Sequence, residues 1–205
     1  MSTLETKQSY HHGDLRNALL DAGSTVAHEV GSEGLSLREV ARRAGVSHTA
    51  AYNHFTDKND LLRGLAVRAF EQLARDLAAA RDADTARLDD FAAAYIRFAF
   101  ARPAEFRFMF QRSLCMPEGV FDPLEEASKA SLAGLREHIV QRQQAGELRA
   151  GDPDDLALAV WSQVHGITTI ILETPAFKSI SPEGAEYLGR QGIRALIAGI
   201  GADSD

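Results

Sequence analysis

Apolar side chains recur every three or four residues along most of the chain, and glycine or proline separates the runs. This spacing is that of one face of an α-helix. In the first run Leu15, Leu19 and Val26 share such a face, which Gly31 and Gly34 then interrupt. No segment convincingly predicts a strand, so the pattern indicates an all-α fold. Runs of this kind predict helices over residues 13–29, 58–80, 88–101, 103–110, 123–144, 154–172 and 182–200.

Two shorter helices joined by a tight turn are predicted in the stretch SLREVARRAGVSHTAAYNHFTDK, which starts at Ser36. Ser36 and Glu39 have the spacing of a capping box at the start of the first helix. Gly45 ends that helix, because glycine adopts the left-handed conformation without a steric penalty. Ser47 is a suitable N-cap for the second helix, over residues 48–54. The pattern is that of a helix-turn-helix, whose second helix can enter the major groove of DNA.

The charge of this stretch differs in sign from that of the chain. The whole chain carries a net charge of −7, which argues against binding polyanions over its entire surface. Between residues 36 and 59 the net charge is +2, and it arises from Arg38, Arg42, Arg43 and Lys58 against Glu39 and Asp57. Each residue taken singly fits a solvated helix face. The caps, the glycine, the small apolar residues and the local positive charge taken together favour DNA binding.

Three segments of the sequence resemble a known family. LREVARRAGVSHTAAYNHFTDKNDLL is similar to the DNA-binding domain of the TetR family of bacterial transcriptional regulators. Upstream, YHHGDLR resembles the start of one large subgroup of that family. Downstream, WSQVHG resembles the signature of a WHG-type C-terminal effector domain. The resemblance implies an N-terminal three-helix DNA-binding domain with a helix-turn-helix, followed by a C-terminal helical domain for ligand binding and dimerisation.

The resemblance also implies DNA contacts at particular positions. His48 and Thr49 would read bases from the start of the second helix, and Arg38 would grip guanine. The other matching positions would hold phosphates and fix the register without reading sequence. Ala51 departs from the pattern, since many members carry leucine there, and it thins the small core. The complete set is Arg38, Ser47, His48, Thr49, Tyr52, His54 and Lys58.

We expect three segments along the chain. Residues 1–58 form the DNA-binding domain with an N-terminal arm, residues 59–80 a connecting helix, and residues 81–205 the effector-binding and dimerisation domain. The last boundary lies near ARDADTAR, the most linker-like stretch of the sequence. The two final long helices carry small residues that permit close helix approach, which together with the resemblance predicts a homodimer. These residues are Ala157, Ala159, Gly166, Gly189, Gly192, Ala195 and Gly199.

The second domain is rich in aromatic residues, most of which are best interpreted as core. Some of them are candidates for lining a ligand cavity between helices. Trp161 and His165 are four residues apart on one helix face, so they offer an apolar wall with one polar group. His165 alone is best interpreted as a core histidine, and the resemblance leaves a pocket role equally open. The candidate ligand-binding residues are Phe98, Met109, Phe110, Trp161 and His165.

Cysteine content and hydropathy favour a cytoplasmic protein. The single Cys115 excludes a disulfide within the chain, and a buried small side chain is favoured over a redox sensor because no resolving cysteine exists. The N-terminus has no apolar run typical of a secretory signal. Residues 156–172 are the best membrane candidate, but they are short and contain polar side chains. We therefore expect a buried helix there and no membrane partner.

The sequence thus predicts a ligand-responsive repressor that binds double-stranded DNA at a palindromic operator as a homodimer, with a small-molecule effector of unknown identity. One alternative is an effector-independent DNA binder or activator that a protein partner controls. A second is an enzyme in which the helix-turn-helix is structural. The sequence argues against the enzyme, because it has no phosphate loop, nucleophile elbow or metal-spaced cluster. We accordingly predict no catalytic residues, no metal and no cofactor.

Overall fold

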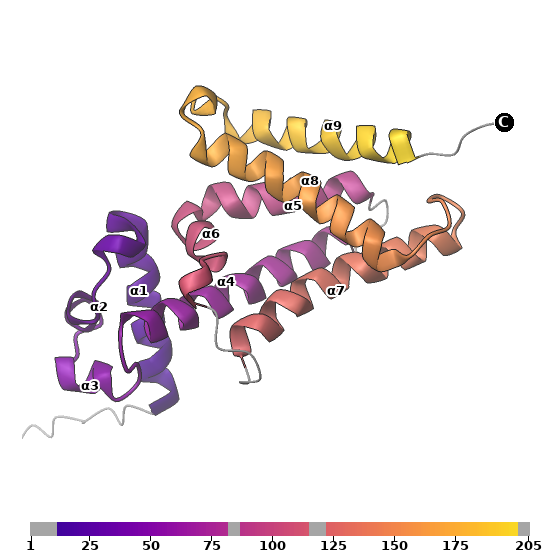
Figure 1. Cartoon of the computed structure of the whole chain (residues 1–205). Helices are drawn as coiled ribbons and strands as arrows, with labels where there is room; N and C mark the ends of the chain where they lie inside the picture. Colours follow the sequence, from indigo (N-terminus) through magenta and orange to yellow (C-terminus); the bar gives the residue numbers. More distant parts are fainter. Residues whose placement is uncertain (1–11, 82–86, 115–121, 201–205) are drawn as a thin grey trace, which may run out of the picture. The chain divides into compact units, whose positions relative to one another are not determined.

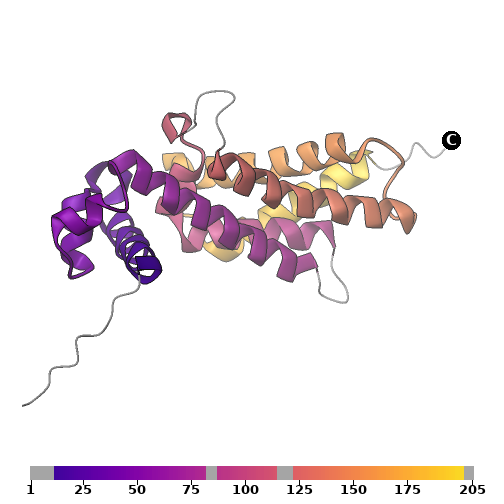
Figure 2. The ribbon, with the colours of Figure 1, turned by 90° about the horizontal axis from the view of Figure 1, so that it is seen from below.

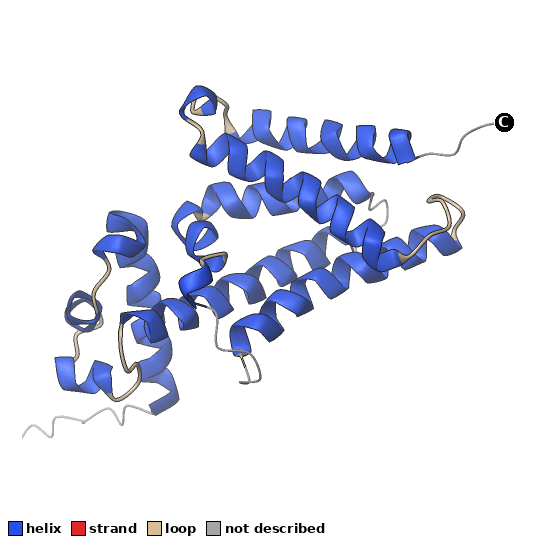
Figure 3. Ribbon diagram, viewed as in Figure 1, coloured by secondary structure: helices blue, strands red, loops and turns tan. Residues whose placement is uncertain are grey.

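The computed structural model describes residues 12–81, 87–114 and 122–200, and every regular element within them is a helix (Figures 1 and 3). The predicted all-α fold is therefore confirmed. Cys115, the N-terminal arm and most of the predicted linker lie outside the described residues. The chain divides into two compact units, Met1–Leu65 and Ala66–Asp205. The division falls within one helix, α4 (Lys58–Arg81), whereas the predicted boundaries stand near its two ends.

The N-terminal unit contains α1 (His12–Gly34), α2 (Leu37–Arg43), α3 (His48–Tyr52) and the first turns of α4. Helix α1 is interrupted at Gly31, whose φ of 73° and ψ of 173° are not helical. The helices share a small core that includes Leu19, Val26, Leu35, Val40, Ala41, Ala51, Phe55 and Leu61. The guanidinium of Arg16 lies 5.0 Å from the centre of the Phe55 ring and covers one side of this core.

The predicted helix-turn-helix is confirmed in its local geometry. The hydroxyl of Ser36 accepts a hydrogen bond from the Glu39 N–H at 3.2 Å, and that of Ser47 accepts one from the Ala50 N–H at 3.1 Å. Between them Gly45 has a φ of 70°, the left-handed conformation that ends α2. Helix α3 ends at Tyr52, two residues before the predicted end, which is within the usual fraying of short helices.

The C-terminal unit is built around α5 (Leu88–Ala101), which is buried on nearly every side. Helix α5 packs against α9 (Pro182–Ile200), α8 (Pro153–Glu173) and α7 (Pro123–Gln144), and α8 lies between α7 and α9 (Figures 1 and 2). Pro103 opens α6 (Pro103–Met109), as predicted. Two short 3₁₀ turns, at Arg112–Leu114 and Pro175–Phe177, are absent from the sequence-based prediction.

Two glycines of α9 are used inside this unit and not on its surface. A Cβ at Gly189 would overlap Ile96 Cδ1 of α5, and one at Gly192 would lie 2.7 Å from Ile167 Cδ1 of α8. Because a real Cβ does not approach so closely, a larger residue here would displace Ile96 or Ile167, so both glycines serve the packing of a single chain. The expectation that both glycines serve the dimer surface is wrong. Gly166 and Gly199, in contrast, would meet nothing within 4 Å among the described residues.

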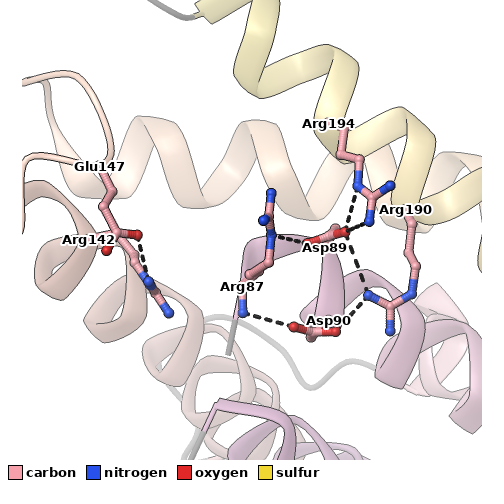
Figure 4. A network of polar contacts seen from close by, with 7 residues as sticks. All are labelled: Arg87, Asp89, Asp90, Arg142, Glu147, Arg190 and Arg194. Carbon is pink, nitrogen blue, oxygen red and sulfur yellow. Dashed lines mark hydrogen bonds and ion pairs between the residues drawn. The ribbon is translucent and has the colours of Figure 1, made fainter. Parts of the chain in front are cut away.

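A polar network ties the start of α5 to α9 (Figure 4). Asp89 is 2% exposed, and its Oδ2 lies 2.6 Å from Arg194 Nη2 and 3.6 Å from Arg190 Nη1. Asp90 accepts hydrogen bonds from Arg190 Nη1 at 2.6 Å and from the Arg87 N–H at 2.9 Å. Partial burial opposes ionisation of Asp90, but the bonds from Arg190 and the Arg87 backbone outweigh it and lower its pKa. Both carboxylates also lie at a helix N-terminus, where negative charge is favourable.

We expect Asp90→Ala to lower the free energy of unfolding by about 1–2 kcal/mol at pH 7, because it removes a helix cap and an ionic hydrogen bond. Since the native pKa of Asp90 is lowered, its contribution is complete above the unfolded value and is lost as pH falls through the native value. The difference between variant and parent should therefore shrink below about pH 4. Urea unfolding measures it, and a pH-independent difference would contradict this assignment.

A matched control for this experiment is Asp154→Ala. The Asp154 side chain is exposed, and it pairs with Arg136 Nε at 2.8 Å on the surface. Exposed ion pairs contribute little to stability, so this substitution should change the free energy of unfolding by less than about 0.5 kcal/mol.

Candidate nucleic-acid interface and effector cavity

Helix α3 turns one face to solvent and one to the core. His48 and Thr49 are exposed, and Tyr52 is 47% exposed. The rings of His48 and Tyr52 pack edge to face with their centres 4.6 Å apart. Ala51 is fully buried on the opposite side, so the small side chain that departs from the family pattern lets α3 lie close to the core. The exposed face therefore presents two rings and two hydroxyls, a set able to contact bases and phosphates.

Ion pairs change the distribution of positive charge that the sequence predicts. Arg42 donates to Glu39 through Nε at 2.8 Å and Nη2 at 2.6 Å. Arg43 bonds Glu29 of α1 through Nη1 at 2.9 Å and also contacts Glu39 at 3.3 Å. Hydrogen bonding to these arginines lowers the pKa of Glu29 and of Glu39. The Glu39 carboxylate thus binds arginine instead of closing the predicted capping box.

Arg38 is the exposed cation that remains on α2. It stands at the second residue of the helix and has no ion-pair partner among the described residues.

Glu29, which neutralises Arg43, lies fourteen residues away in sequence. Its role was missed because no local pattern indicates it, and only the packing of α1 on α2 brings the two together. The sequence-based charge count therefore overstates the positive charge available to a polyanion.

The remaining positions lie at the end of α3 and the start of α4. Ser47 is exposed and caps α3. His54 and Lys58 are half-buried, and Lys58 Nζ donates to the backbone carbonyl of Glu33 at 2.7 Å. Lys58 therefore fixes the connection between α1 and α2. An ammonium group has three N–H donors, so this contact leaves two for other acceptors such as phosphate oxygens.

The C-terminal unit encloses a cavity of about 160 Å³ among α4, α5, α7 and α8. Phe110 and Trp161, both predicted from the sequence as ligand-binding residues, line it. Met109 lines a neighbouring cavity of about 400 Å³, whereas Phe98 is buried under Arg102 and lines neither. The walls of the first cavity are Phe70, Leu73, Leu77, Phe91, Tyr95, Phe110, Ser128, Lys129, Ser131, Leu132, Leu158 and Trp161.

His165 does not line this cavity, but it contacts two residues that do, Tyr95 and Trp161. Its Nδ1 is 2.9 Å from the hydroxyl of Tyr95, and its ring stacks on Trp161 with the centres 5.1 Å apart at 20°. Burial lowers the pKa of His165 and raises that of Tyr95, so both are neutral near pH 7. The structure thus places His165 as a part-buried histidine that is hydrogen-bonded within the unit. It holds Tyr95 and Trp161, both of which line the cavity.

Comparison with known families matches most of the chain. Residues 19–65 match the profile of bacterial regulatory proteins of the tetR family, and residues 88–196 match that of the tetracyclin repressor-like C-terminal domain. Two curated relatives from Mycobacterium tuberculosis strains, described as HTH-type transcriptional regulators, are each 30% identical over 143 residues. That alignment covers 68% of this chain and 56% of the relative. The chain thus spans about half the length of these relatives.

Solved structures of similar proteins share the fold. A protein of unknown function from Rhodococcus sp. RHA1 is 32% identical, with 93% of this chain and 100% of that chain covered and a TM-score of 0.75. The TetR family transcriptional regulator PfmR from Thermus thermophilus is 22% identical, with 90% and 99% covered and a TM-score of 0.64. At the latter identity the likeness concerns the fold alone.

We expect Tyr95→Phe to lower the free energy of unfolding by about 1–2 kcal/mol, because it leaves the part-buried His165 Nδ1 without its partner. Urea unfolding followed by the emission of Trp161, the single tryptophan, reports on this site directly. Tyr52→Phe is the matched control, since it removes an exposed hydroxyl and should change stability by less than about 0.5 kcal/mol. Equal effects of the two substitutions would contradict a structural role for the Tyr95 hydroxyl.

Proposed function

Since the chain belongs to the TetR family of bacterial transcriptional regulators, we propose that it is a repressor that binds a palindromic operator as a homodimer and releases it when a small molecule binds. The observation that carries the DNA-binding part is the capped α3 with His48, Thr49 and Tyr52 on its exposed face. Arg38 adds, on the preceding helix, a cation that no described residue neutralises. The net charge of −7 disfavours contact with DNA elsewhere on the chain.

An exposed apolar surface on α8 and α9 supports the homodimer. Leu158 and Ile170 of α8 are 53% and 51% exposed, and Tyr187 of α9 is 62% exposed. Gly166 and Gly199 face open space within the described part of the chain, which permits another helix to approach closely. Large apolar side chains exposed on two packed helices favour an interface. A two-fold dimer presents two copies of α3, whose half-sites on DNA would lie about 34–36 Å apart or a multiple of that.

The cavity supports control by a small molecule. Helix α4 begins with Lys58 in the DNA-binding unit and lines the cavity with Phe70, Leu73 and Leu77 in the other unit. A ligand that favours one position of these side chains therefore has a continuous helix through which to act. A preference of about 1.4–2.8 kcal/mol between the two conformers would weaken operator binding roughly 10- to 100-fold.

Two alternatives remain distinct from this proposal. An effector-independent DNA binder or activator would bind its site with an affinity that no small molecule changes. An enzyme is disfavoured, because members of this family of regulators are typically not enzymes. We also propose a cytoplasmic location with no membrane partner. Helix α8 is long and apolar enough to cross a membrane, but the core helix of a soluble protein passes the same test.

Selection of DNA fragments by the purified protein should enrich an inverted repeat. If each subunit neutralises about two or three phosphates, the logarithm of the binding constant should fall with the logarithm of salt at a slope of roughly −4 to −5. Arg38→Ala should weaken binding at least about tenfold, because it removes a cation that has no acidic partner among the described residues. Fluorescence anisotropy of a labelled operator measures both effects.

Arg42→Ala is the matched control for Arg38→Ala. Its guanidinium is already bound by Glu39, so its removal should weaken binding less than about threefold. A salt slope near zero, or equal losses for the two arginines, would contradict the proposed interface.

Tyr187→Asp should weaken self-association at least about tenfold, because it places a charge on an exposed apolar surface that a partner would bury. Sedimentation equilibrium of the full chain measures the dissociation constant. Gln141→Asp, on the exposed side of α7, adds the same charge outside this surface and should leave the constant unchanged. A parent protein that remains monomeric at high micromolar concentration would refute the dimer.

A further inference from the structure

A second, smaller cavity adjoins the one described above, within the same unit. It has a volume of about 40 Å³ and shares Leu77, Phe91 and Ser131 with the larger cavity. The larger cavity is lined almost entirely by apolar side chains. The smaller one adds three nitrogen-rich side chains to its apolar lining, those of Arg81, Arg87 and His138. The pair of cavities therefore has an apolar part and a part rich in hydrogen-bond donors.

His138 has a buried nitrogen without a partner in the described part of the chain. The residue lies on α7 and is 5% exposed, and the unpartnered atom is Nδ1. Leaving a buried polar atom unsatisfied costs about 1–3 kcal/mol, so such an atom in a native protein requires an explanation. Because His138 lines the smaller cavity, a molecule bound there can supply the missing partner.

The charges around His138 favour an anion as that partner. Burial and then the positive charges of Arg142 and Arg81 lower the pKa of His138, while Glu147 and Asp90 oppose them weakly. The imidazole is therefore neutral near pH 7, and one ring nitrogen carries a hydrogen to donate. The cationic groups that line the cavity are Arg81 and Arg87.

Both arginines are held in place by an acidic side chain. Arg81 Nη1 lies 3.1 Å from Glu137 Oε2, and Arg87 Nε lies 3.3 Å from Asp89 Oδ1. A guanidinium has five N–H groups in a planar fork whose geometry suits a carboxylate. These contacts therefore hold the two guanidinium groups at the lining of the smaller cavity.

The volumes limit the size of the ligand. A cavity of roughly 150 Å³ holds a benzene molecule, so the larger cavity has room for one ring or a short alkyl chain. The smaller cavity, of about 40 Å³, has room for a group the size of about three or four waters, at about 10–15 Å³ each. A carboxylate fits this space, whereas a nucleotide does not.

We propose that the effector is a small carboxylic acid with an aryl or short alkyl body. The body occupies the apolar cavity against Phe70 and Trp161, and the carboxylate accepts a hydrogen bond from His138 between Arg81 and Arg87. This inference rests on the proposed function, because it names the chemical class of its effector. It also explains why α7 places a histidine, and not an apolar residue, at this point of the wall.

The test is titration of the full-length protein with phenylacetate, 3-phenylpropanoate, 4-phenylbutanoate and octanoate. Calorimetry gives the affinities, and the emission of Trp161 reports occupation of the apolar cavity. The best acid should bind at least about tenfold more tightly than its neutral amide. His138→Leu keeps a similar volume without nitrogen, and should weaken the acid at least about tenfold and the amide much less.

Three further variants make the result specific. His138→Gln restores a donor and should recover part of the affinity for the acid. Gln141→Leu, on the exposed side of α7, should leave it unchanged. Lys129→Ala removes the cationic side chain that lines the larger cavity, and should also leave the affinity for the acid unchanged. Loss of acid binding in Lys129→Ala but not in His138→Leu would place the carboxylate elsewhere and overturn the proposal.

Operator binding in the presence of the same compounds separates this inference from the proposed function. If no acid alters Trp161 emission up to about 10 mM, while some other small molecule releases the operator, the inference fails and the ligand-responsive repressor stands. Equal affinity for acid and amide overturns the inference as well. If an acid binds through His138 but leaves operator affinity unchanged, the carboxylate site stands and the ligand response fails.

Discussion

The burial of α5 is the constraint on which the C-terminal unit depends. Ten of the fourteen residues of this helix are buried, nine of them apolar or aromatic, and α7, α8 and α9 enclose them. An apolar helix of this kind gains its stability from removal of its whole surface from water. The enclosure is close where glycine permits it, as at Gly189, whose missing side chain leaves room for Ile96. On the side of Phe91 and Tyr95 the surrounding helices leave space, and the larger cavity lies there.

Two polar arrangements around α5 differ in what stabilises them: ion pairs in one, and a hydrogen bond between neutral groups in the other. At its N-terminus, Asp89 keeps its place in the interior because Arg194 and Arg190 pair with it from α9. Further along, the Tyr95 hydroxyl and His165 satisfy one another without charge. His138 fits neither arrangement, since its buried Nδ1 has no partner among the described residues. Because His138 also lines a cavity, a bound molecule can supply the missing partner.

In the DNA-binding unit, the sequence predicts contacts between residues three or four positions apart, but not contacts between distant segments. The serine caps and Gly45 act over three or four residues, so their spacing in sequence is enough to predict the turn. Glu29 pairs with Arg43, and the Glu33 carbonyl accepts from Lys58, across the packing of different helices. Contacts between different helices occur at no fixed separation in the sequence, so a sequence pattern does not predict them. A count of charges along the segment therefore missed that Arg42 and Arg43 are already neutralised.

The sequence by itself determined the all-α fold, the approximate extents of the helices and the family, because helical periodicity, caps and short motifs are local signals. Of the candidate cavity residues, it found Phe110 and Trp161 but could not separate them from Phe98, since an apolar ring facing a neighbour and one facing a space have the same pattern. Only the tertiary structure decided which glycines pack within the chain, that His165 is held by Tyr95, and that His138 lines a cavity. Each of these depends on which side chains of distant segments meet, and that is settled by the volumes that must fit together when the helices pack.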